Sequence, residues 1–330
     1  MTGSESGGPP LLRRGAGGAA VRDVQGRLAE GGIPVVVDGE YGPKTEAAVR
    51  AFQERRGLRV DGICGPETWS ALVESRFRLG DRLLSLRRPM MRGDDVAELQ
   101  RRLNALGFDA GREDGILGPE TETAVRHFQR QAGLAPDGIL GPATHAALDR
   151  LGGLAAGSVA SVRERESLRS TRRLEDCRLI VMTDPELADL GRAVAEAVET
   201  TGATVVLDTS GADYSVLTAE ANRLEADVFL ALLSGSEGCT QCAYFANQTF
   251  RSESGYNAAA RLTDELRAVT GTVEAPIGRT YRLLRETRMA AVVCELVAPS
   301  SAEQPKADAL AAAIVTGVRR ALEEPPSPSD

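Results

Sequence analysis

A Cys-x-x-Cys motif is one place where side chains of this sequence could do chemistry. Cys239 and Cys242 have the spacing of half a zinc site or of a redox-active thiol pair. A structural zinc site would need two more ligands, for which Cys177 and Cys294 are the candidates in that half of the chain. One pair alone favours free thiols, with a metal or thiol sensor centred on the motif as an alternative.

Histidine, the usual ligand of catalytic zinc, occurs only twice in the chain. Catalytic zinc takes three protein ligands and leaves one position open for water. His127 and His145 both lie in the first half, at positions that an internal repeat matches with Ala51 and Trp69. Neither has the spacing of a metal ligand, so we interpret both as ordinary helix residues.

The repeat that contains these histidines is a duplication of the first half of the chain. The segment 38–53 returns as 114–129, an offset of 76 positions, with Asp-Gly, Gly-Pro and Ala-Val-Arg-x-Phe-Gln in both copies. A shorter form of the motif follows at 61–68 and at 137–144. Two copies of one small structural unit are therefore expected.

Each copy should fold as a bundle of three helices. The Asp-Gly pairs predict tight turns, and each Gly-Pro pair predicts a helix with proline at its first position. Apolar residues at helical spacing predict one further helix before each motif. The expected starts are Pro43, Pro66, Pro119 and Pro142, and the further helices contain Val21, Val24 and Leu28 or Val96, Leu99 and Leu103. Trp69 and Phe128 are predicted core residues.

Four aspartates precede the glycines of these turns and could in principle hydrogen-bond sugar hydroxyls. Aspartate before glycine more often stabilises the turn itself, because its side chain accepts a hydrogen bond from the backbone two residues on. We therefore predict the turn role for Asp38, Asp61, Asp114 and Asp137.

The second half has a different pattern, in which short apolar runs alternate with helical ones. This alternation predicts an α/β domain with a mostly parallel sheet. The expected strands are Leu179–Thr183, Thr204–Asp208, Val228–Leu233, Ala243–Asn247, Tyr281–Leu284 and Ala291–Leu296. The expected helices are Glu186–Glu199, Tyr214–Glu225, Asn257–Val269 and Ala307–Leu322.

The predicted organisation is thus multidomain. Two all-α repeats at 11–75 and 86–150 are followed by a linker at 151–176, which is rich in glycine, serine and mixed charge. The α/β domain spans 177–323. The tail 324–330 is disordered by composition and contains Ser327 and Ser329 as candidate phosphorylation sites.

Charge and composition exclude several classes of function. The net charge of −8 is concentrated in residues 177–330, which sum to −9, whereas residues 1–176 sum to +1. Aromatic residues make up only 4%. The chain therefore lacks the basic field and the stacking surfaces that nucleic-acid binding needs.

The sequence also predicts a cytoplasmic protein. No apolar run approaches the ~20 residues of a membrane span, and the first residues contain no run of signal-peptide length. Five cysteines are an odd number, unlike a disulfide framework. We expect no membrane span and a reducing compartment.

The repeats resemble the peptidoglycan-binding domain of bacterial wall hydrolases. The resemblance rests on Asp-Gly-x-x-Gly-Pro-x-Thr and Ala-Val-Arg-x-Phe-Gln and covers about 11–150. It implies binding of glycan strands or stem peptides without chemistry. It leaves open which positions contact the ligand.

Residues 177–323 resemble the zinc-dependent N-acetylmuramoyl-L-alanine amidases, mainly through Leu-Leu-Arg-Glu-Thr-Arg-Met-Ala-Ala-Val-Val-Cys-Glu-Leu at 283–296. The resemblance implies that Glu295 stands at the catalytic carboxylate. Because that strand is apolar, Glu295 should need a partner, for which Arg285 is the candidate. The family's glycine-rich loop with its first zinc-binding histidine is missing after Thr183, and Leu233 occupies the place of the second.

Three functions follow from these patterns. The leading hypothesis is a non-catalytic regulator of cell-wall synthesis without a cofactor, similar to actinobacterial amidase-like proteins that regulate precursor synthesis inside the cell. Its partners would be peptidoglycan fragments or a lipid-linked precursor, together with an enzyme of precursor synthesis such as the one that makes the first committed precursor. The alternatives are a working zinc amidase and the cysteine-based sensor.

Overall fold

The computed structural model describes residues 11–151, 172–211, 214–235, 240–247, 250–296 and 307–324. The chain divides into two compact units, Met1–Ala160 and Ser161–Asp330. Most of the predicted linker lies outside the described residues, as do Cys239, Ser327 and Ser329.

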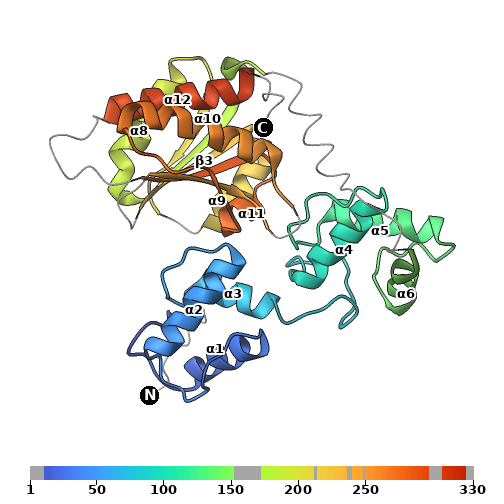
Figure 1. Ribbon diagram of the computed structural model, residues 1–330. Coiled ribbons are helices and arrows are strands. Elements are labelled where there is room, and N and C mark those ends of the chain that lie inside the picture. The colour runs from blue at the N-terminus through green and yellow to red at the C-terminus, as the bar shows by residue number, and fades with distance from the viewer. Residues whose placement is uncertain are drawn as a thin grey trace, which may run out of the picture. The chain divides into compact units, whose positions relative to one another are not determined.

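The described part of the first unit consists of two helical repeats (Figure 1). The first contains α1 (Ala19–Glu30), α2 (Pro43–Arg56) and α3 (Pro66–Glu74), and the second contains α4 (Asp94–Ala105), α5 (Pro119–Gln131) and α6 (Pro142–Leu151). All four helix starts predicted at Gly-Pro pairs are confirmed, because proline at the first helical position gives up no hydrogen bond. Helix α2 ends before Gly57, whose φ of 66° favours glycine.

Each repeat has its own apolar core. Phe52 and Phe128 occupy corresponding places in the two cores, and each is 1% exposed. The prediction for Phe128 is therefore confirmed. Trp69 instead lies at the edge of the first core, partly buried, with the guanidinium of Arg27 5.2 Å from its ring centroid. A ring of this size is too large for a helix face that packs through Ala71 and Leu72.

The second unit is built on a six-stranded sheet in the order β2-β1-β3-β6-β4-β5. The strands are β1 (Arg178–Thr183), β2 (Thr204–Asp208), β3 (Val228–Ser234), β4 (Gln241–Phe245), β5 (Ile277–Arg279) and β6 (Ala290–Leu296). All neighbouring strands are parallel except β4 and β6, which are antiparallel. The predicted mostly parallel sheet is confirmed.

Helices cover both faces of this sheet (Figure 1). On one face α10 (Glu253–Thr270) packs against α12 (Ala307–Glu323), which packs against α8 (Ala188–Glu199). On the other, α9 (Tyr214–Arg223) packs against α11 (Arg282–Glu286). Two 3-10 turns, η1 (Leu174–Asp176) and η2 (Pro185–Leu187), precede β1 and α8.

One predicted strand is wrong. Residues 281–284 were expected to form a strand, but Arg282–Glu286 is the helix α11 and the nearby strand is β5, which was not predicted. A short apolar run cannot distinguish a strand from a buried helical turn by periodicity alone. The ion pair between Arg282 and Glu286, at 2.8 Å and four residues apart, is one that only a helix places side by side.

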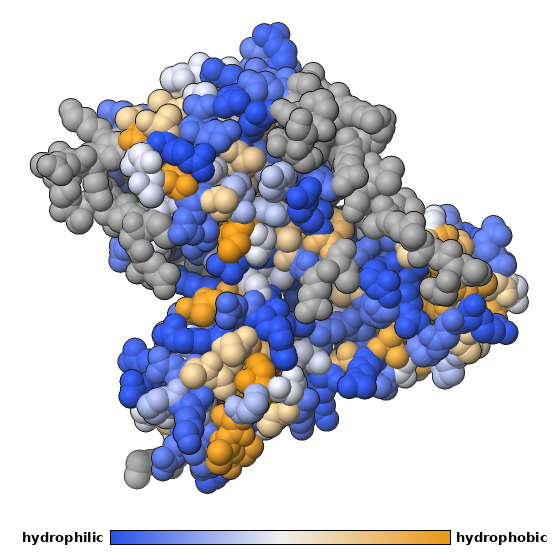
Figure 2. Space-filling view, in the orientation of Figure 1, coloured by the Kyte–Doolittle hydropathy of each residue, from blue (hydrophilic) through white to orange (hydrophobic). Residues whose placement is uncertain are grey.

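The surface drawn in Figure 2 is mainly hydrophilic, with small separate apolar patches. Within the described ranges every helix is too short or too polar to cross a lipid bilayer.

Candidate functional site

The register of β3 and β6 brings together the two positions that sequence reasoning singled out at the sheet's carboxyl edge. Leu233 is the Cα partner of Glu295, and on its other side Glu295 faces Gln241 of β4. Leu233 is 9% exposed and Glu295 is half-buried. A family catalytic site at this edge would therefore have a hydrocarbon side chain directly beside its carboxylate.

Glu295 has a neutral partner. The hydroxyl of Tyr281 donates a hydrogen bond of 2.8 Å to Glu295 Oε1, and Tyr281 is itself only 5% exposed. Arg285, the partner expected from the sequence, lies on α11 and not in a strand. Glu295 stands near the end of β6 and is only half-buried. A neutral hydroxyl is therefore enough to satisfy its carboxylate, whereas a fully buried carboxylate would need a cation. Sequence reasoning missed Tyr281 because its segment was assigned to a strand.

The residues after β1 are tied to the end of β3. Asp184 donates its N–H to the carbonyl of Leu232 at 3.1 Å, and its Oδ2 accepts the N–H of Ser234 at 2.9 Å. Glu186 Oε2 accepts the hydroxyl of Ser234 at 3.0 Å. The two carboxylates thus fix the connection between β1 and η2. Because η2 begins right after β1, there is no room for the glycine-rich loop expected of an active amidase.

These residues do not fit a catalytic zinc ion. Leu233 has no donor atom, and Asp184 and Glu186 supply carboxylates without an imidazole, a set that suits magnesium or calcium better. The two histidines of the chain, His127 on α5 and His145 on α6, belong to the other unit. Among the described residues no group of three histidine, cysteine or acidic side chains is arranged to hold a metal.

Of the cysteine motif, Cys242 alone lies within the described residues. Cys242 is fully buried in β4, and its Sγ lies 3.5 Å from Sγ of Cys294 in β6. The hydrogen bond between these two thiols, followed by burial, raises the pKa of Cys294. Burial also raises the pKa of Cys177 to about 11. Both are thiols at neutral pH and therefore poor nucleophiles and poor metal ligands.

The helical repeats contain a polar network that sequence reasoning missed. The Gln53 side chain donates to Asp61 Oδ1 at 2.7 Å, to the carbonyl of Ile63 at 3.0 Å and to Thr68 Oγ1 at 3.1 Å, and it accepts the N–H of Gly62 at 2.8 Å. The same four bonds form around Gln25, Gln100 and Gln129. The signal was present as a glutamine in the helix before each Asp-Gly-x-x-Gly-Pro-x-Thr segment, 8 residues before Asp61 and Asp137 and 13 or 14 residues before Asp38 and Asp114.

This network confirms the predicted turn role of the aspartates. In each of the four turns Oδ1 accepts the backbone N–H two residues on, at 2.8–2.9 Å. These bonds favour the charged form. The N–H of Glu40, followed by Gln25, lowers the pKa of Asp38, and the N–H of Ile139, followed by Gln129, lowers that of Asp137.

The lowered pKa values predict a pH dependence of stability. A carboxyl whose pKa is lower in the folded state stabilises the fold above its unfolded pKa of about 3.9, and this contribution is lost as pH falls through the folded pKa. We expect the double variant Asp38→Asn/Asp137→Asn, which keeps the acceptor oxygens, to be less stable than wild type at pH 6. Between pH 6 and pH 3 the thermal midpoint of the variant should fall less than that of wild type. Equal falls for the two proteins would contradict the lowered pKa values of Asp38 and Asp137.

Comparison with known proteins agrees with both units. Residues 17–72 and 92–148 match the family described as a putative peptidoglycan binding domain. Over 295 residues, covering 78% of this chain and 71% of the relative, the chain is 33% identical to the N-acetylmuramoyl-L-alanine amidase CwlM of Mycobacterium tuberculosis. The chain belongs to the N-acetylmuramoyl-L-alanine amidase family.

Other relatives of the family match smaller parts. The amidase CwlL of Bacillus licheniformis is 35% identical over 164 residues, which cover 43% of this chain and 46% of that protein. Among solved structures, the amidase AmiC2 of Nostoc punctiforme is similar to 42% of this chain over 94% of its own, with 17% identity and a TM-score of 0.35. The predicted family resemblance is confirmed by the match of the repeats to the peptidoglycan-binding family and by the identity with CwlM.

Proposed function

We propose that the chain binds peptidoglycan fragments through its repeats and regulates cell-wall synthesis without hydrolysing the wall. The observation that carries the proposal is the pairing of Leu233 with Glu295 at the carboxyl edge of the sheet. Leu233 has no atom that can ligate zinc at a position where the family has a zinc-binding histidine. The connection from β1 to η2 is also too short for the loop that contains the family's other zinc-binding histidine.

The remaining side chains at this edge support a structural role. Glu295 is held by Tyr281, and Asp184 and Glu186 are held by Ser234, so each carboxylate is engaged by the fold. We therefore interpret Glu295 as a relic of the catalytic carboxylate. In this proposal the protein needs no cofactor, and zinc belongs to the alternative of a working amidase.

The repeats support the binding half of the proposal. Their four Gln-centred networks and separate cores are intact, and they match a peptidoglycan-binding family. The ligand would be a soluble muropeptide or a lipid-linked precursor. The acidic second unit would serve as a platform for an enzyme of precursor synthesis, which a pull-down from lysate with this unit as bait would identify.

We place this function in the cytoplasm. The cysteines support that placement, since the four described ones are buried free thiols and Cys242 and Cys294 lie within 3.5 Å without being bridged. A reducing compartment keeps such thiols reduced.

Binding to wall material tests the proposal directly. The full chain is mixed with purified sacculi for sedimentation and with soluble muropeptides for calorimetry. We expect saturable binding in at least the muropeptide titration, and no binding in either would remove this half of the proposal. The double variant Gln53→Ala/Gln129→Ala is the control for folding. It removes the hydrogen bonds of one turn in each repeat, so any loss of binding should match the fraction of the repeats that is unfolded.

A further inference from the structure

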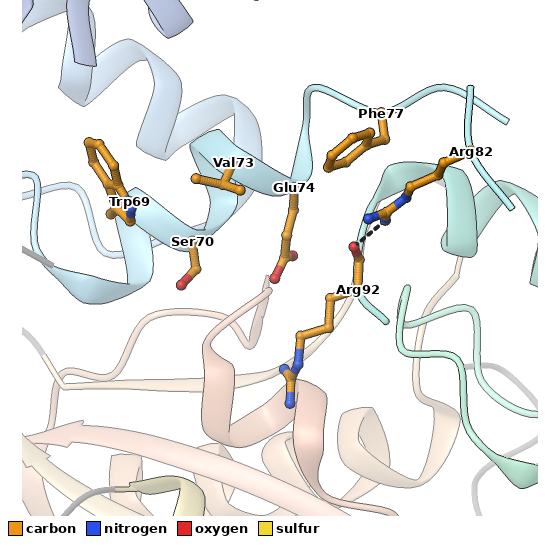
Figure 3. A pocket seen from close by; sticks show the side chains of 7 residues that line it. All are labelled: Trp69, Ser70, Val73, Glu74, Phe77, Arg82 and Arg92. Atoms are coloured by element: carbon orange, nitrogen blue, oxygen red, sulfur yellow. Dashed lines mark hydrogen bonds between the residues drawn. The ribbon is translucent and has the colours of Figure 1, made fainter. Parts of the chain in front are cut away.

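The open pocket beside α3 has charged walls, but the fold already uses those charges. Arg82 donates a hydrogen bond of 2.6 Å to the backbone carbonyl of Arg92 (Figure 3) and pairs with the buried Asp95 at 2.7 Å. Glu74 and Arg92 also have interactions within the chain. The reactive groups that the fold leaves unused lie in the second unit, and they are two buried thiols.

Cys242 and Cys294 face one another across two neighbouring strands. They are Cα partners in the antiparallel register of β4 and β6, and their Sγ atoms lie 3.5 Å apart. Residues directly opposite in an antiparallel pair have Cα atoms about 4.5 or 5.5 Å apart, and disulfides span about 4.4–6.8 Å between Cα atoms. Side-chain rotation can therefore bring the two sulfurs to the bonding distance of about 2.05 Å while the strands stay in place.

The surroundings of the pair keep it reduced at rest. Both thiols are 0% exposed, and they belong to the apolar core between the sheet and the helices α8, α10 and α12. A buried thiol reacts slowly with an oxidant, because the thiolate is the reactive form. Reaction therefore requires local opening, and β4 lies beside the edge strand β5, which has only three residues. Such an edge opens more readily than the central strands.

A bond between the two sulfurs would lock a joint of the sheet. In the strand order, β6 is the neighbour through which β4 and β5 join the parallel strands β3, β1 and β2. The chain between Cys242 and Cys294 contains α10, β5 and α11. It also contains Tyr281, whose hydroxyl holds Glu295. A disulfide would enclose this whole segment in a covalent loop, which restricts its unfolded states and disfavours opening.

We propose that Cys242 and Cys294 are a redox switch, which a peroxide converts into a disulfide between β4 and β6. The sulfur of one cysteine, as thiolate, attacks a peroxide oxygen, so that the O–O bond breaks, a sulfenic acid forms and the released hydroxide takes up the thiol's proton as water. The second sulfur then attacks the sulfenic sulfur, so that the S–S bond forms and the S–O bond breaks. The departing hydroxyl leaves as water with the second thiol's proton.

The overall reaction is balanced and reversible. The two thiols lose two electrons, and hydrogen peroxide gains them as it becomes two molecules of water. A dithiol reductant restores the pair by thiol–disulfide exchange and is itself oxidised to a disulfide. The inference goes beyond the proposed function and does not depend on it.

Peptide mapping tests which sulfurs are joined. The full chain is treated with hydrogen peroxide, unfolded in an alkylating reagent, digested and examined by mass spectrometry. We expect one cross-linked pair of peptides, containing Cys242 and Cys294, that is lighter by two hydrogen atoms than the separate peptides and is lost on reduction. Cys64 and Cys177 are matched controls, since both are buried free thiols. Cys64 lies in the core of the first repeat and Cys177 donates its thiol to the carbonyl of Arg173, so both should be recovered alkylated.

Two variants separate the strand pair from the sequence motif. Cys294→Ala should abolish the cross-link and leave Cys242 to be alkylated. Cys239→Ser should leave the cross-link unchanged, because the strand register pairs Cys242 with Cys294. Cys239→Ser tests the pairing even if Cys294→Ala does not fold. A disulfide between Cys239 and Cys242 would overturn the proposed pair.

Calorimetry of the oxidised full chain tests whether the bond acts as a switch. Dithiothreitol reduces a disulfide but leaves methionine sulfoxide oxidised, so the change on adding it isolates the disulfide. We expect the thermal midpoint of the second unit to fall by roughly 5–15 °C on reduction, as for loss of a cross-link that closes a long loop. An unchanged or higher midpoint on reduction would overturn the switch. Recovery of both cysteines unbridged, from protein whose methionines the peroxide has oxidised, would overturn the proposal as a whole.

Discussion

Replacing Phe128 by alanine is expected to lower the free energy of unfolding of the first unit by about 3–5 kcal/mol, the range for large-to-small changes in a packed core. Phe128 is 1% exposed and meets the edge of Phe108 with ring centroids 5.5 Å apart. The variant loses both the buried area and this aromatic pair. The second repeat has a small core of its own, which leaves few neighbours to close the cavity.

The measurement is denaturant unfolding followed by circular dichroism, with Leu83→Ala as the matched control. Leu83 is next to Leu84, which belongs to the same core, but is itself 60% exposed, so its loss should change stability by no more than about 0.5 kcal/mol. Equal unfolding curves for Phe128→Ala and Leu83→Ala would show that Phe128 does not carry the core of its repeat.

The elements that could be predicted from sequence are those with a local physical cause. Proline fixes its own φ, so the helices at Pro43 and Pro119 begin where the Gly-Pro pairs place them. The strand Thr204–Asp208 also follows its apolar run, residue for residue. The turn role of Asp38 could be predicted because its bond to the N–H of Glu40 is local.

What could not be predicted depends on contacts distant in sequence. Residues 281–284 carry no periodicity that decides between a strand and a turn of helix, and their helical form places Tyr281 against Glu295 fourteen positions away. The sequence motif pairs Cys242 with Cys239, whereas the register of β4 and β6 places Cys242 opposite Cys294.

At the carboxyl edge of the sheet we expect no hydrolysis of the bond between muramic acid and the peptide. In a zinc hydrolase the metal lowers the pKa of its bound water to about 7, so that hydroxide is available at neutral pH. The residues described at this edge do not fit that metal, so Glu295 would have to activate bulk water without a Lewis acid to polarise the amide. Loss of several kcal/mol of transition-state stabilisation slows a reaction by orders of magnitude, since each 1.36 kcal/mol is about tenfold.

Glu295→Gln is therefore expected to leave any muropeptide release unchanged. The substitution keeps the shape of the side chain and an oxygen that can accept the hydrogen bond from Tyr281. Its main effect should be on the local hydrogen bond, with a small change in stability. A working amidase of the family, assayed on the same wall preparation, shows that the substrate is competent.

The most direct test measures bound zinc by elemental analysis and muropeptide release by chromatography, on the wild-type full chain and on Glu295→Gln. We expect zinc far below one equivalent and no release of peptide from muramic acid above the protein-free control in either protein. Near-equimolar zinc together with turnover that Glu295→Gln abolishes would contradict it and identify the chain as a working amidase.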